Sequence, residues 1–222
     1  MTVILVLVTF LIFIVIDYFF VHRRTAQSAA VEGRAAAPVS TAGEYVDGFL
    51  VPKQMAYHPG HSWLLRERRN LVRVGADEFA AALAGHVERI ELPRPGQWVR
   101  QGQKVFALYR DGEKTELVSP TEGEVTAVNP DVIGNPELLR KDPYGKGWFV
   151  TVHVPDEEST SRNLVPGGLV RSWMREAVER LYGMQPKLAG LAAADGGSPT
   201  HDLLAGLPDV SWKEVTREFF LT

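Results

Sequence analysis

The sequence contains no cysteine among its 222 residues. Disulfide bonds, thiolate metal sites and cysteine nucleophiles are therefore excluded, and the absence suits a reducing compartment. An excess of one charge is also missing, because 24 Lys and Arg nearly balance 27 Asp and Glu. The formal net charge is −3, and no basic stripe with interleaved aromatic residues is present. The composition therefore does not predict a nucleic-acid-binding protein.

The sequence motifs of common active sites are missing as well. There is no phosphate-binding glycine loop, no HExxH zinc motif and no nucleophile elbow, and the scattered acidic residues form no catalytic pair. His58 and His61 are three residues apart, but Pro59-Gly60 between them disfavours the helix that would align two metal ligands. We therefore expect packing or surface roles for both histidines, and we interpret Asp195-Gly196-Gly197 as a plain loop rather than an anion site. No catalytic or metal-binding residue is predicted, and the chain is not expected to be an enzyme.

A long apolar run does occur at the N-terminus. Val3 to Phe20 comprises eighteen residues with one charge, and as a helix it would cover about 27 Å, close to the hydrocarbon thickness of a bilayer. No Lys or Arg precedes the run and no small-residue cleavage site follows it, so the pattern predicts an uncleaved anchor rather than a signal peptide. His22-Arg23-Arg24 follows directly. The positive-inside rule then places the N-terminus outside a bacterial-type inner membrane and the remainder in the cytoplasm.

Two further features belong to this N-terminal region: an acidic residue within the predicted anchor and a polar segment after it. Asp17 lies near its cytoplasmic edge, where a carboxylate either reaches headgroup water or contacts a partner helix, and we favour the first. Thr25 to Glu44 is small, polar and Ala-rich, without apolar periodicity. We interpret residues 1–24 as the anchor with its basic flank, and residues 25–46 as a flexible linker.

Residues 47–155 show the pattern of a compact all-β unit. Short apolar-alternating runs are separated by Pro, Gly, Asp and Asn clusters. The predicted strands are Leu71–Val74, Val87–Leu92, Val105–Tyr109, Glu124–Val128 and Trp148–His153. Two short helices are expected at Asp77–Ala84, ended by Gly85, and at Pro136–Lys141, capped by Asn135.

The same stretch resembles the H protein of the glycine cleavage system, a member of the biotinyl/lipoyl-attachment family. The matching pieces are Tyr57, His61-Ser62-Trp63, Arg73-Val74-Gly75, Ala84-Gly85-His86-Val87, Glu91-Leu92-Pro93, Pro95-Gly96, Gly102, Ser119-Pro120, Gly123-Glu124-Val125, Asn129, Pro136-Glu137-Leu138, Asp142-Pro143-Tyr144-Gly145 and Gly147-Trp148. Their order and spacing carry the resemblance. It implies a flattened barrel of two packed β-sheets, with a hairpin that normally presents a lipoylated lysine at its tip.

This sequence departs from the family at that lysine. Counting back from Ser119-Pro120, the family's lipoyl position falls on Gly112. Asp111-Gly112 between two strand-like runs predicts a two-residue hairpin turn. Lys114 lies two residues along the returning strand, on the same face but set back from the tip. No cofactor is therefore expected, and a lipoyl group on Lys114 is the alternative.

Residues 156–222 extend beyond the resembling stretch. Asp156–Arg162 is interpreted as a charged spacer, and Leu169–Tyr182 as an amphipathic helix that ends at Gly183. A capping-box pattern begins a last helix, Ser211–Phe220, which presents Trp212, Val215, Phe219 and Phe220. The sequence leaves open whether these helices pack on the barrel or on a partner.

The sequence thus predicts an α+β, mainly β chain: a lipoyl-like flattened barrel with one N-terminal transmembrane helix and C-terminal helices. We interpret it as a non-catalytic, single-pass structural or interaction subunit of a larger membrane-protein complex. Its other expected contact is with the lipid bilayer, through Val3–Phe20. The alternative function is a lipoyl swinging-arm carrier modified at Lys114 and related to glycine cleavage.

Overall fold

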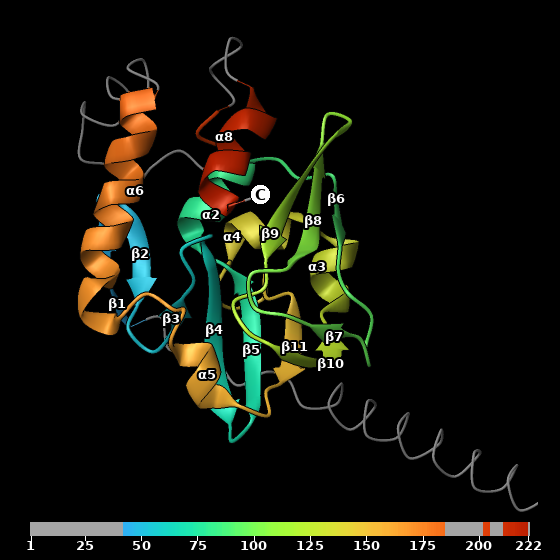
Figure 1. The fold of residues 1–222 in the computed structure, drawn as a ribbon. Helices are drawn as coiled ribbons and strands as arrows, with labels where there is room; N and C mark the ends of the chain where they lie inside the picture. The colour runs from blue at the N-terminus through green and yellow to red at the C-terminus, as the bar shows by residue number, and fades with distance from the viewer. Residues whose placement is uncertain (1–41, 185–201, 205–210, 222) are drawn as a thin grey trace, which may run out of the picture. The chain divides into compact units, whose positions relative to one another are not determined.

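The computed structural model describes residues 42–184, 202–204 and 211–221 (Figure 1). The predicted anchor Val3–Phe20, Asp17, most of the predicted linker and the Asp195-Gly196-Gly197 loop lie outside these ranges. Within them, no helix is long and apolar enough to cross a membrane.

Two antiparallel sheets form the centre of the fold. The larger has the strand order β3-β4-β5-β11-β10-β7, and the smaller has the order β6-β8-β9. The six strands of the larger sheet are β3 (Ala56–Tyr57), β4 (Ser62–Arg68), β5 (Leu71–Ala76), β11 (Val150–His153), β10 (Gly123–Val128) and β7 (Trp98–Val99). The three strands of the smaller sheet are β6 (Arg89–Glu91), β8 (Lys104–Arg110) and β9 (Glu113–Val118). This arrangement confirms the mainly β prediction.

Aromatic and aliphatic side chains from both sheets fill the core. Trp63 is fully buried, and its indole N–H donates to the Ala76 carbonyl at 2.8 Å. Phe106 from the smaller sheet meets Phe149, which precedes β11, with ring centroids 5.1 Å apart. Because strand side chains alternate between the faces, these inward residues hold the two sheets together.

Three short helices connect strands of the two sheets. In α2 (Glu78–Ala84) the preceding Asp77 is the N-cap, since its side chain accepts from the Ala80 N–H at 2.8 Å. The predicted cap of α4 (Glu137–Lys141) by Asn135 is wrong, because α4 has no side-chain cap. Asn135 instead ends α3 (Pro130–Gly134), a helix that the sequence analysis missed.

Asp142 organises the loop that leads from α4 to β11. Its carboxylate accepts from the N–H groups of Gly145 and Lys146 at 3.0 and 2.8 Å, and its carbonyl accepts from the Gly147 N–H at 2.8 Å. Tyr144 from the same loop is buried, and its hydroxyl donates to the Leu50 carbonyl at 2.7 Å. These contacts give the loop a structural role between α4 and β11.

Gly147→Val is expected to lower the free energy of unfolding by about 2–3 kcal/mol. An added Cβ would lie 2.6 Å from the Leu138 carbonyl oxygen and 2.8 Å from that of Asp142, so backbone must shift. Gly134→Ala is the matched control, since its Cβ meets nothing within 4 Å, and it should be neutral or slightly stabilising. Denaturant unfolding of both variants checks this. A Gly147→Val protein as stable as wild type would contradict the packing described.

The N-terminal boundary of the folded unit differs from the predicted one. Residues 43–46, expected as linker, form strand β1 (Gly43–Val46), which pairs with β2 (Phe49–Pro52). Val46 and Phe49 are buried in the core. The alternating apolar pattern covers too few residues here to predict a strand instead of a loop.

The C-terminal extension packs on the barrel rather than standing apart from it. The predicted spacer contains a helix, α5 (Glu157–Ser161), whose Thr160 hydroxyl meets that of Thr121 at 3.2 Å. A 3-10 turn (Gly167–Leu169) leads into α6 (Val170–Met184), and α8 (Trp212–Phe220) lies against α2 and β9 (Figure 1). Helix α6 continues through Gly183, so the predicted end at that residue is wrong.

Candidate functional site at the β8–β9 hairpin

The β8–β9 hairpin closes with the two-residue turn that the sequence predicts. Arg110 pairs with Glu113, and the residues between them, Asp111 and Gly112, have φ values of 51° and 76°. Positive φ at both central positions defines a type I′ turn, whose twist matches that of the flanking strands. A Cβ added at Gly112 would meet nothing within 4 Å. The tip projects at the upper end of the molecule (Figure 1), and it carries no amine.

Lys114 lies on the outer face of the hairpin and is already partnered. It is opposite Tyr109 in the register, and its Nζ donates to Glu116 Oε1 at 2.9 Å. This hydrogen bond raises the pKa of the Lys114 ammonium. The side chain is 46% exposed. Solvent reaches the amine, but the ion pair favours its protonated, non-nucleophilic form.

A second cation pairs in the same way on the other edge of this sheet. Arg89 in β6 forms an ion pair with Glu91 on its own strand, and its guanidinium lies 3.7 Å from the centroid of the Tyr109 ring. The Tyr109 hydroxyl donates to Glu91 Oε2 at 2.7 Å, which lowers the pKa of that carboxyl and raises the pKa of the phenol. The outer face around Lys114 is therefore a charge-matched polar surface.

Arg110, the last residue of β8 before the turn, is held from the other side of the hairpin. Its guanidinium donates to the Ala84 carbonyl at 3.4 Å and to Asp202 Oδ1 at 3.1 Å. Both side chains of the Arg110–Asp202 pair are about 15% exposed (15% and 14%). The described C-terminal segment 202–204 thus ties the hairpin to the end of α2. No local sequence pattern predicts this contact, because the two positions are 92 residues apart.

The two histidines have packing roles. His61 Nδ1 donates to Asp77 Oδ2 at 2.8 Å, and its ring lies between Phe79 and Trp173 at centroid distances of 4.5 and 4.6 Å. His58 Nδ1 accepts from the Gly60 N–H at 3.1 Å. No group of three His, Cys, Asp or Glu side chains among the described residues is placed to hold a metal ion.

His58 should make stability depend on pH. Burial, reinforced by nearby His61, lowers the pKa of His58 to about 4 from an ordinary 6.5. As pH falls from 6.5 to 4, His58 binds a proton in the unfolded chain but not in the folded chain. The free energy of unfolding therefore falls by up to about 3 kcal/mol. His58→Gln should flatten this part of the profile, whereas His153→Gln, at an exposed position, should not. Identical profiles for wild type and His58→Gln would contradict the assignment.

The two sheets and the projecting hairpin define a mainly β, lipoyl-type fold. A family model described as Glycine cleavage H-protein matches residues 55–176. The chain is 37% identical over 106 residues to a glycine cleavage system H protein of Mycobacterium leprae, covering 48% of this chain and 80% of that protein. The H protein of Carboxydothermus hydrogenoformans is 32% identical over 117 residues, covering 53% and 89%. The crystal structure of the Mycobacterium marinum H protein aligns with a TM-score of 0.44 at 25% identity, covering 47% of this chain and 87% of that one. The chain belongs to the glycine cleavage H-protein family.

Proposed function

We propose that the chain is a non-catalytic, membrane-tethered H-protein-like subunit with a structural or interaction role in a larger cytoplasmic-membrane complex, such as a respiratory or photosynthetic one. The observation that carries this proposal is the type I′ turn at Asp111-Gly112, which leaves the hairpin tip without an amine. A carrier needs a nucleophilic side chain at the position that its attachment enzyme reads. A glycine there removes the attachment point and keeps the hairpin.

The surroundings of the tip support a fixed rather than a swinging role. Lys114 is engaged by Glu116, and Arg110 is engaged by Ala84 and Asp202. The C-terminal extension adds α5, α6 and α8 to the outside of the barrel. Of these helices α8 contacts β9 of the hairpin, and a hairpin held in this way suits a domain that presents surfaces to other subunits.

The membrane tether is proposed from the sequence of the N-terminal region. Val3–Phe20 supplies an apolar span and His22-Arg23-Arg24 supplies the positive flank, so the barrel belongs in the cytoplasm. A reporter fused after Thr222 is expected to be active only if it works in the cytoplasm. Protease added outside spheroplasts and cleaving the barrel would refute this topology.

The subunit role is tested by extraction of a tagged chain from its host with a mild detergent. We expect the chain to elute with other membrane proteins at a fixed ratio, well above the size of its own micelle. A tagged chain that elutes alone after extraction and after chemical cross-linking would contradict a role as a subunit.

A second candidate function is a lipoyl carrier modified at Lys114. Two observations favour it: the matched relatives are named glycine cleavage system H proteins, and the Lys114 side chain is 46% exposed beside the turn. The two candidates differ in one measurable property, the covalent state of Lys114.

A further inference from the structure

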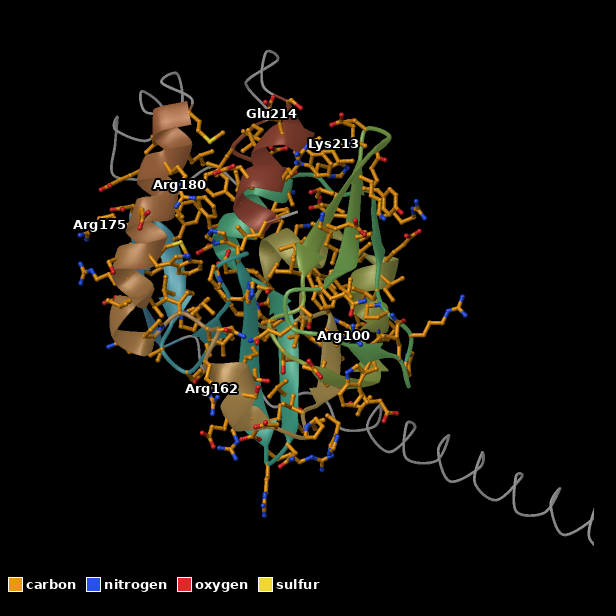
Figure 2. All side chains as sticks on the ribbon, in the orientation of Figure 1. Arg100, Arg162, Arg175, Arg180, Lys213 and Glu214 are labelled. Carbon is orange, nitrogen blue, oxygen red and sulfur yellow. The ribbon has the colours of Figure 1, made fainter. Side chains whose placement is uncertain are left out.

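Helix α8 is attached to the barrel through one apolar stripe. Trp212, Val215, Phe219 and Phe220 are each at most 7% exposed, and they occupy positions i, i+3, i+7 and i+8. Lys213 and Glu214 lie on the exposed side of the helix (Figure 2). This spacing is that of amphipathic helices bound in apolar grooves of other proteins.

The groove beneath α8 is built by the barrel. Phe79 of α2 meets Phe219 with ring centroids 5.2 Å apart, and the Ala84 carbonyl accepts from the Trp212 indole N–H at 3.1 Å. On the other side, β9 closes the groove. These wall residues fall within the family match at 55–176, whereas α8 lies outside it.

A glycine permits the close fit at the far end of the groove. A Cβ added at Gly60 would lie 3.1 Å from the Phe220 carbonyl oxygen and 2.8 Å from Val118 Cγ2. A side chain here would require the main chain at the end of α8 to shift by a few tenths of an ångström, so the missing side chain leaves room for the α8 backbone.

Helix α8 is capped at both ends by residues of its own segment. The Ser211 hydroxyl caps its first turn by accepting from the Glu214 N–H at 3.2 Å. Leu221 ends it in a left-handed conformation, with its N–H bonded to the Arg217 carbonyl. Among the described residues, its polar links to other elements are the Trp212–Ala84 hydrogen bond and a 3.8 Å ion pair between Arg180 and Glu218. Residues 185–210 join it to α6.

We propose that α8 is an internal ligand of a helix-binding groove, and that an amphipathic helix of a partner with the same apolar spacing replaces it there. The groove presents Phe79 and the edge of β9, so it is stable in water only when a helix covers it. The departure of α8 would break few polar links, and a partner helix with the same apolar stripe would restore the apolar burial that the departure removes. The biological use of this exchange rests on the proposed interaction role, but the exchange itself does not.

The test uses the full chain in detergent and a fluorescent peptide of residues 209–222. Wild type is compared with the full-length double variant Trp212→Ala/Phe219→Ala, which weakens its own α8 and leaves the groove intact. We expect the peptide to bind the variant at least tenfold more tightly than it binds wild type. A peptide carrying the same two alanines is the matched control and should bind neither chain. Equal binding of the wild-type peptide to both chains would overturn the proposal.

Hydrogen exchange on the wild-type chain gives a readout that needs no variant. The amides of α8 should exchange at least tenfold faster than those of α2, since α8 opens without the barrel unfolding. Exchange of α8 at the rate of α2 would make it a permanent part of the core and would also overturn the proposal. Either failure leaves the covalent state of Lys114, and with it the proposed function, unaffected.

Discussion

Gly112→Lys should turn an unmodified chain into one that accepts a lipoyl group. Wild type, co-expressed with lipoate-attachment enzymes, is expected to stay unmodified because its tip has no amine. The substitution returns a lysine to the position that carries the lipoyl group in the resembling family. A Cβ meets no atom within 4 Å at this position, so the cost is backbone strain at a φ of 76°. That strain is about 1 kcal/mol, which a domain of this size can absorb.

Intact mass measures the outcome, and Glu113→Lys is the matched control, since it adds an amine beside the turn without placing it at the tip. We expect modification of Gly112→Lys and none of Glu113→Lys. Modification of wild type at Lys114 under the same conditions would contradict it. Failure of all three chains to be modified would show that the surface recognised by the attachment enzymes has also changed.

Asp77→Ala should cause the largest loss of stability, about 4 kcal/mol, because two buried donors lose their acceptor at once. The Asp77 carboxylate accepts from the Ala80 N–H and from His61 Nδ1, each at 2.8 Å, and Asp77 is 0% exposed. His61 is the ring that Phe79 and Trp173 enclose. Its displacement should therefore loosen the contact of α6 with the barrel as well as the start of α2.

Asp156→Ala is the control for this substitution. Asp156 caps α5 by accepting from the Ser159 N–H at 3.0 Å, but the site is exposed. Its replacement should cost only about 1 kcal/mol, since water can satisfy the freed donor. Chemical denaturation of both variants gives the comparison. An Asp77→Ala protein destabilised no more than Asp156→Ala would mean that the buried pair contributes nothing beyond an ordinary cap.

Local signals in the sequence predicted local structure well. Asp111-Gly112 fixes a type I′ turn because both residues tolerate positive φ, and Ser211 begins α8 through its hydroxyl. The prediction failed where one residue can serve two elements. Asn135 ends α3 instead of starting α4, and the Asn129-Pro130 pair that begins α3 was the overlooked signal. Gly183 did not stop α6, which continues to Met184, and Gly183 does not adopt the positive φ with which a glycine commonly ends a helix.

Sequence patterns do not predict contacts between residues that are far apart in the chain. The apolar stripe of α8 predicted a buried face but not which surface would cover it, and the answer involves Phe79, over a hundred positions away along the chain. The ion pair between Arg110 and Asp202 corresponds to no periodic pattern or motif in the sequence. Such contacts follow from how the elements pack, so only the structure shows that Arg110, next to the turn, is held by Asp202.

The intact mass of the chain purified from its own host tests the central claim most directly. We expect the mass of the unmodified polypeptide, because Gly112 offers no amine and Lys114 is held by Glu116. A mass larger by one lipoyl group, which disappears in Lys114→Ala, would contradict the claim and establish the carrier function instead.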